Sequence, residues 1–191
     1  FEGNNYSAEW VVEAEKRGLP NIRTAPEAFA VLLQPQHKEL LTKKVGVLSE
    51  SELESRYNIM MERYIKDIQV EAGTLESMIR TQVLPAAFTF RKNLADSAAA
   101  LVAVKKELAA PEISALEELT PIVEAIQTAV SRLSVALVEF EGHDISVEEH
   151  AEAANKIIIP LMEQVRQNSD KLETLISDKE WPIPNNFITS I

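Results

Sequence analysis

The chain has 191 residues, of which 46% are hydrophobic, so it can bury the core of one or at most two domains and is not a disordered tail. Nineteen basic and thirty acidic residues give a net charge of −11, which argues against a nucleic-acid binder and against a polybasic membrane anchor. The absence of cysteine excludes disulfides, thiolate catalysis and cysteine-ligated metal sites, and only five glycines argue against a phosphate-cradling loop.

The first 48 residues carry the signals of three short helices. Ser7 can cap a helix that Gly18 ends. Thr24 and Glu27 form a capping-box pattern with a proline in the first turn, which predicts a second helix. A third short helix is predicted over residues 36–44.

A very long periodic segment follows, introduced by a capping-box pattern at Ser49 and Glu52. Sixteen apolar or small residues recur there at steps of three and four, with a mean step of 3.67. This is the period of a helix and excludes strands, whose period is 2. Unbroken, the helix would be about 85 Å long. The predicted buried stripe is Leu53, Tyr57, Met60, Tyr64, Ile68, Ala72, Leu75, Ile79, Val83, Ala86, Phe90, Leu94, Ala98, Leu101, Val104 and Leu108.

Two further long helices are predicted after this segment. Pro111 can open the first of them, and residues 141–144 break it. Ser146 and Glu149 form another capping-box pattern, and the helix they open should end near Asp178. The first buried stripe is Leu116, Leu119, Val123, Ile126, Val130, Leu133, Leu137 and Phe140. The second is Ala151, Ala154, Ile158, Leu161, Val165, Leu172 and Ile176.

Prolines interrupt the predicted helices at Pro85, Pro121 and Pro160, and each removes one backbone hydrogen bond at a cost of about 3 kcal/mol. We expect kinks there, although Pro121 could instead begin a new helix. The kinks are either tolerated by a curved bundle or shape it around a neighbouring subunit.

These elements predict an all-α fold: a long antiparallel bundle of about three long helices, with short N-terminal helices and an extended C-terminal tail. The expected division is a short-helix segment at 1–48, a bundle at 49–179 and a tail at 180–191, since the prolines at 182 and 184 prevent helix there. The apolar stripe is longer than its partner helices can cover. Residues 53–64 and 88–90 are therefore expected to need further partners, and the isolated chain is expected to self-associate.

No catalytic, cofactor-binding or metal-binding residue is predicted within the chain. His37, His143 and His150 lack the Glu-x-x-His spacing of a di-iron bundle and are interpreted as exposed polar residues. Acidic clusters are interpreted as solvated helix faces or first turns, where acid complements the helix dipole. They are Glu13/Glu15, Glu50/Glu52/Glu54, Glu117/Glu118 and Glu148/Glu149. Nucleotide-binding and nucleophile-elbow motifs do not occur. The aromatic residues are interpreted as packing: Trp10, Tyr57, Tyr64, Phe88, Phe90 and Trp181.

Several strings, in the same order along the chain, resemble the segment that follows the catalytic domain in type III glutamine synthetases. They are GNNYSAEW at 3–10, EAEKRGL at 13–19, TAPEA at 24–28, GVLSESELESRY at 46–57, TQVLPAA at 81–87, IIPLM at 158–162, VR at 165–166, DKLE at 170–173 and WPIP at 181–184. The resemblance spans nearly the whole chain.

The resemblance implies a parent enzyme of nitrogen metabolism that makes glutamine from glutamate, ammonia and ATP with a divalent metal such as Mg, as a large homo-oligomer. It places the active-site residues in an upstream catalytic domain. Phe1 is not a methionine, which fits a chain cut from a longer protein. The expected partners are therefore that catalytic domain and sister subunits, with no nucleic acid and no membrane. The expected location is cytoplasmic, with an organelle left open.

Two alternatives belong to other classes. One is a free-standing helical adaptor that binds a partner helix through its apolar stripe. The other is a metal- or small-molecule-binding bundle enzyme, which the missing Glu-x-x-His pattern disfavours.

Overall fold

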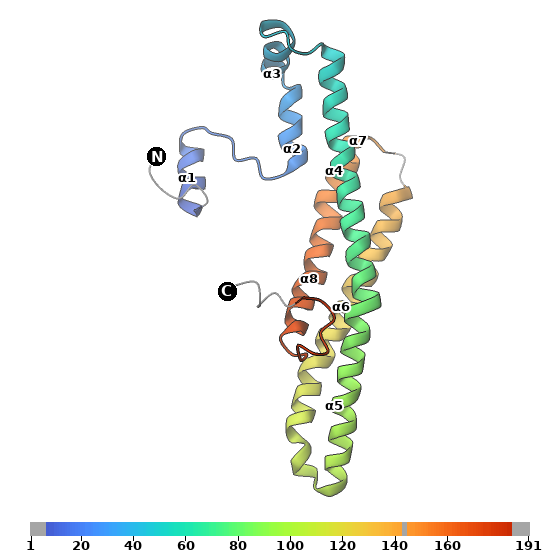
Figure 1. The fold of residues 1–191 in the computed structure, drawn as a ribbon. Coiled ribbons are helices and arrows are strands. Elements are labelled where there is room, and N and C mark those ends of the chain that lie inside the picture. The colour runs from blue at the N-terminus through green and yellow to red at the C-terminus, as the bar shows by residue number, and fades with distance from the viewer. Residues whose placement is uncertain (1–6, 143–144, 185–191) are drawn as a thin grey trace. The chain divides into compact units, whose positions relative to one another are not determined.

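The computed structural model describes residues 7–142 and 145–184, and these contain helices and turns without any strand, which confirms the predicted all-α class (Figure 1). The chain divides into two compact units, residues 1–64 and 65–191. Helix α4 (Glu50–Met78) begins in the first unit and ends in the second. The segment boundaries at 48/49 and 179/180 stay predictions.

The first unit contains α1 (Ala8–Lys16), α2 (Ala25–Ala30), the 3₁₀ turn η1 (Val31–Leu33), α3 (Pro35–Glu39), the π-turn η2 (Leu40–Lys44) and the start of α4. The predicted caps are present, since Ser7 accepts a hydrogen bond from the Trp10 N–H and Thr24 accepts one from the Glu27 N–H. Gly18 and Gly46 adopt φ of 71° and 67°, which lets the chain turn after α1 and after η2. Lys38 of α3 pairs with Glu50 and Glu54 of α4 at 3.2 and 3.0 Å.

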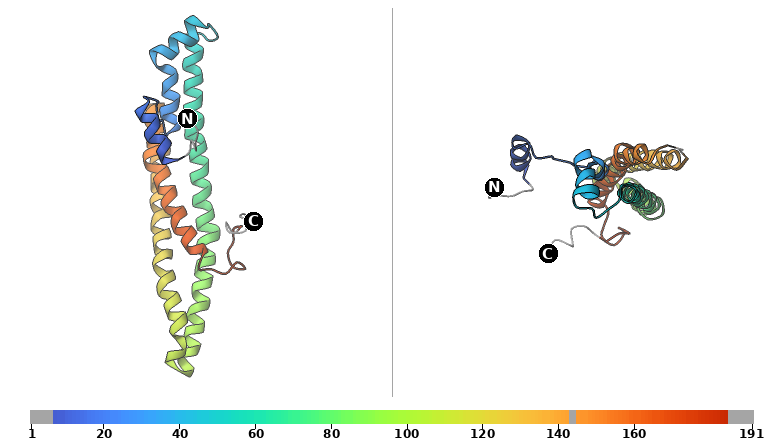
Figure 2. Two further views of the ribbon diagram at one scale, coloured as in Figure 1. Left: turned by 90° about the vertical axis from the view of Figure 1, so that its left-hand side faces the viewer. Right: turned by 90° about the horizontal axis from the view of Figure 1, so that it is seen from above.

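The second unit is built from three long helical segments. Helix α4 continues through the π-turn η3 (Ile79–Val83) into α5 (Leu84–Val104), and η4 (Lys106–Ala109) leads into α6 (Ala110–Gly142). Helix α7 (Val147–Ala153) continues through the π-turn η5 (Ala154–Ile158) into α8 (Ile159–Glu173). Helix α6 runs beside both α5 and α8, antiparallel to each (Figures 1 and 2). The antiparallel bundle is therefore confirmed.

The core of the second unit follows the predicted stripes of α6 and α8. The α6 side chains with at most 1% exposure are Leu119, Val123, Ile126, Val130 and Leu133. All seven residues of the predicted stripe at 151–176 are buried. This apolar burial, at about 25 cal/mol per Å², is the main force that holds the helices together.

Two of the three internal prolines follow a π-turn. The Leu84 N–H donates to the carbonyl of Ile79, and the Ile159 N–H donates to the carbonyl of Ala154, so each reaches back five residues instead of four. The widened turns lie directly before Pro85 and Pro160. Pro121 lies inside the continuous helix α6 and does not begin a new helix.

The predicted surplus apolar surface is confirmed in part, since Ile59 is 59% exposed and Phe88 is 37% exposed, but more of it lies elsewhere. Leu53 and Tyr57 are only 1% and 4% exposed, so the expectation that residues 53–64 need further partners is wrong for them. Helix α5 ends at Val104 rather than Leu108, and α8 stops short of the end of the α5–α6 hairpin (Figures 1 and 2). Without a third helix there, the hairpin end exposes Val102, Val104, Leu108 and Ile113.

One helical stretch among the described residues, Lys106–Gly142, is long and apolar enough to cross a membrane by length and composition alone. The sequence contains no uninterrupted apolar run of that length, and the mean hydropathy of the relevant window is 1.3. The same stretch supplies the buried stripe that packs against α5 and α8. A core helix of a bundle passes the same test, so the finding carries no membrane assignment.

Candidate functional site

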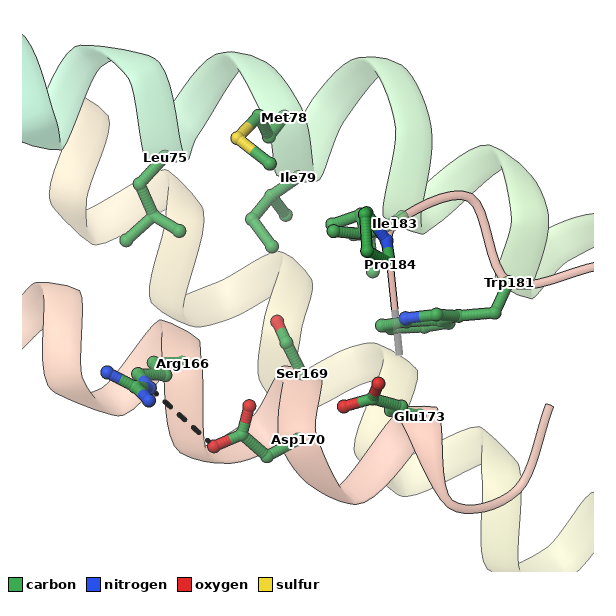
Figure 3. Close-up of a pocket in the computed structure, with 11 residues that line it drawn as sticks. Leu75, Met78, Ile79, Arg166, Ser169, Asp170, Glu173, Trp181, Ile183 and Pro184 are labelled. Atoms are coloured by element: carbon green, nitrogen blue, oxygen red, sulfur yellow. Dashed lines mark ion pairs between the residues drawn. The ribbon is translucent and has the colours of Figure 1, made fainter. Parts of the chain in front are cut away.

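A cavity of about 220 Å³ lies in the second unit between the α4–η3 helix, helix α8 and the segment 181–184 (Figure 3). One wall is apolar and is formed by Leu75, Met78, Ile79 and Val83. Because η3 is a π-turn, this wall is built partly from backbone that departs from regular helix. Such π-turns occur frequently at functional sites.

The segment 181–184 forms the second wall through Trp181, Ile183 and Pro184. It is anchored one residue earlier, because Glu180 accepts hydrogen bonds from the Asn93 side chain of α5 at 3.1 Å and from the Ser177 hydroxyl at 3.0 Å. The Trp181 N–H also donates to the Ser177 carbonyl. This anchoring places the Trp181 indole at the cavity edge, where Figure 3 shows it beside Glu173.

The third wall is polar and comes from one face of α8. Arg166, Ser169, Asp170 and Glu173 line it at helical spacing. The Arg166 Nε lies 3.8 Å from the Asp170 Oδ2, and the Ser169 hydroxyl donates to the Val165 carbonyl at 2.9 Å. Glu173 is only 6% exposed and is the one buried charged side chain among the described residues. The described residues of this wall carry two carboxylates and one guanidinium, a formal charge of −1.

A second, wider cavity of about 490 Å³ lies within the first unit. Leu32, Leu41, Leu48 and Leu53 form its apolar wall, with Glu52 and Arg56 at the side. The polar residues among its described lining are Glu52, Ser55 and Arg56.

The histidines are not brought together. His37 lies half-buried in α3, and its Nδ1 is buried without a hydrogen-bond partner among the described residues. The His150 Nε2 lies 2.7 Å from the carbonyl oxygen of Phe140, and its ring meets the Phe140 ring edge-on with centroids 4.2 Å apart. His150 therefore joins the start of α7 to the end of α6. His143 lies outside the described residues.

The acidic clusters are distributed over separate helix surfaces. Glu117 and Glu118 are exposed on α6, and Glu50 and Glu54 pair with Lys38. Across residues 7–142 and 145–184, no three His, Asp or Glu side chains converge in a way that could hold a metal ion. The predicted packing role of Tyr57 is confirmed, since it is 4% exposed.

Two acidic residues complete the predicted capping boxes. The Glu52 carboxylate accepts from the Ser49 N–H at 2.7 Å while the Glu52 N–H donates to the Ser49 hydroxyl at 3.2 Å. Glu149 and Ser146 exchange the same bonds at 3.0 and 3.2 Å. The backbone and hydroxyl bonds from Ser49 lower the pKa of Glu52 below its ordinary 4.5. The hydroxyl and backbone bonds from Ser146 lower the pKa of Glu149 in the same way.

We expect these caps to make the stability of the fold decrease as the pH falls in the acid range. A carboxyl whose folded-state pKa is lowered stabilises the fold above its unfolded pKa, and this contribution is lost as the pH falls through the folded-state value. Urea midpoints measured from about pH 6 to pH 3 should therefore fall less steeply for the double variant Glu52→Gln/Glu149→Gln, because glutamine keeps the cap without titrating. The control Glu117→Gln/Glu118→Gln removes two exposed carboxyls outside the caps and should keep the original slope; an equal flattening in both variants would contradict the prediction.

Comparison of the amino-acid sequence with known proteins identifies the family of the chain. A sequence model described as the glutamine synthetase C-terminal domain matches residues 1–102. The chain belongs to the glutamine synthetase C-terminal domain family. The match covers the first unit, helix α4 and nearly all of α5.

Full-length relatives extend the similarity to almost the whole chain. The chain is 35% identical over 189 residues to a protein named type-3 glutamine synthetase from Dictyostelium discoideum, with 96% of this chain and 25% of the relative covered. It is 30% identical to a glutamine synthetase from Butyrivibrio fibrisolvens and 29% identical to one from Bacteroides fragilis, each with 26% of the relative covered. The chain therefore spans about a quarter of the length of the curated relatives it matches.

Membership in this family confirms the resemblance found in the sequence. Neither the sequence nor the family match indicated the cavity beside α8. The Trp-Pro-Ile-Pro string at 181–184 was interpreted as an extended tail and as part of the family resemblance. Arg166, Asp170 and Glu173 belong to strings that resemble the family, but their spacing is that of any charged helix surface and does not indicate a cavity.

Proposed function

We propose that this chain is the C-terminal helical domain of a type III glutamine synthetase and that its role is structural, in supporting the catalytic domain and joining subunits. The parent enzyme would ligate ammonia to glutamate with ATP and Mg. The family match and the relatives' names support the parent activity. By the resemblance to the family, the nucleotide and metal would bind in the upstream catalytic domain.

The observation that carries the structural role is the apolar end of the α5–α6 hairpin. Val104 is 77% exposed and Leu108 is 50% exposed, while Val102 and Ile113 are exposed beside them. Gathered exposed apolar side chains mark contact surfaces, because a monomer gains nothing from leaving them in water.

A second copy of the chain is the occupant that the charges favour. Lys105 and Lys106 lie at the hairpin end, whereas the whole chain has a net charge of −11. Residues 102–113 carry two lysines and two glutamates, and Lys105 pairs with Glu107 at 3.9 Å, so the hairpin end is formally neutral on an acidic chain. It therefore meets less charge repulsion from a second, acidic copy than the acidic helix faces would. Such a head-to-tail contact closes into a ring when its rotation permits.

Light scattering of the purified chain tests this role. We expect a mass above that of the monomer at high concentration, and the double variant Val104→Glu/Leu108→Glu should shift it to the monomer, because two charges replace the apolar contact. Val138→Glu places a charge at another exposed valine, on α6, and should leave association unchanged. The same preparations should form no glutamine from glutamate, ammonia and ATP. A monomeric unchanged chain, equal dissociation by Val138→Glu, or glutamine formation would contradict the proposal.

A further inference from the structure

We propose that the cavity between α8 and the segment 181–184 binds a small organic cation, namely a primary ammonium group carried on an unbranched apolar chain. The inference does not depend on the proposed assembly role, because the cavity lies in one unit of one chain.

The cavity has the size and the lining for the apolar part of such a ligand. Its volume of about 220 Å³ is far above the ~10–15 Å³ that one water molecule requires. Leu75, Met78 and Ile79 face Ile183 and Pro184 across it (Figure 3). An aliphatic chain placed there exchanges water for apolar contact on two sides, which is the usual source of affinity in small-molecule sites.

The polar wall selects the charge of the ligand. Asp170 and Glu173 bring two carboxylates to this wall, and Arg166, the one cation among its described residues, lies 3.8 Å from the Asp170 carboxylate. Glu173 already has an interaction within the protein, yet a carboxylate offers about four acceptor positions, so it can also accept from an ammonium group. An anion would meet the net negative wall, and a neutral alcohol would gain no ion pair.

Burial makes Glu173 the group most sensitive to a bound cation. The residue is 6% exposed and already has an interaction within the protein, and an ammonium beside its carboxylate would add a charge-assisted hydrogen bond to it. Trp181 lies next to Glu173 in Figure 3, so its ring can contact the cation by its face. The Asn93–Glu180 hydrogen bond holds Trp181 in this place before any ligand arrives.

Tryptophan fluorescence measures this binding directly. The chain has two tryptophans, Trp10 and Trp181, so Trp10→Phe leaves Trp181 as the sole reporter. Titration with hexylammonium chloride at neutral pH should change the emission saturably. Hexanol and sodium hexanoate, which keep the chain and change the head group, should bind at least tenfold more weakly.

Variants on α8 assign the effect to the cavity. In the Trp10→Phe background, Glu173→Gln should weaken hexylammonium binding at least tenfold, whereas Glu163→Gln removes an exposed carboxylate of the same helix and should not change it. If Glu173→Gln lowers the helical circular dichroism signal, Asp170→Asn replaces it, with at least a threefold loss expected. The proposal is overturned if hexylammonium does not saturate, if hexanol binds as tightly, or if Glu163→Gln weakens binding as much as the cavity variant.

Discussion

Truncating Leu133 to alanine should lower the free energy of unfolding by about 2–5 kcal/mol. Leu133 has no exposed surface, and it lies on α6, the helix that packs against both α5 and α8. The substitution removes apolar contact and leaves a cavity that neighbours on two sides would have to fill. Urea denaturation followed by circular dichroism at 222 nm measures the change.

A matched control exists on the same helix. Val138→Ala also removes methyl groups from α6, but Val138 is 71% exposed, so its stability change should stay within about 0.5 kcal/mol. A loss below about 1 kcal/mol for Leu133→Ala would show that α6 is not the centre of the core. A comparable loss of stability in Val138→Ala would show that the Val138 side chain is buried against another surface in solution.

The sequence predicted the helices of the second unit well because their apolar period is regular. Along α6, seven of the eight residues predicted to be buried are so, and Leu116 is half-buried. The caps were predicted equally well, since Ser146 and Glu149 are three residues apart and form local hydrogen bonds with each other. Local signals of this kind do not depend on the rest of the fold.

The long first segment was predicted less accurately, for two physical reasons. Met61 and Ile65 are buried where Met60 and Tyr64 were expected, because both pairs continue a three-and-four spacing and only tertiary contacts choose between them. At Pro85 the preceding π-turn adds a residue to one turn and shifts the buried position only locally, since Ala98 further along α5 is buried as predicted. Ala87 is consequently buried in place of Ala86.

The end of that segment and the cavity were missed because they depend on long-range arrangement. The period continued to Val104 and Leu108, yet α8 stops short of the hairpin end and leaves them exposed. The cavity needs α4, α8 and residues 181–184 together, and its anchor, the Asn93–Glu180 hydrogen bond, joins residues 87 positions apart. No sequence spacing reports such a contact.

Enlarging Ala87 to leucine should destabilise the bundle by about 1–3 kcal/mol. Ala87 has no exposed surface, and it lies on α5, which packs along α6. A small side chain at such a position lets two helices approach closely, and three added carbons force either the helices apart or the side chain into a strained rotamer.

Thermal unfolding measures this effect, because for a chain of this length each kcal/mol shifts Tm by about 2–4 °C. Ala100→Leu makes the same change at an exposed position of the same helix and should leave Tm almost unchanged. A variant Ala87→Leu as stable as the unchanged chain would mean that space remains between α5 and its neighbours. The helices would then be held by their long side chains alone, and the alanine-rich composition of α5 would have no role in bringing them together.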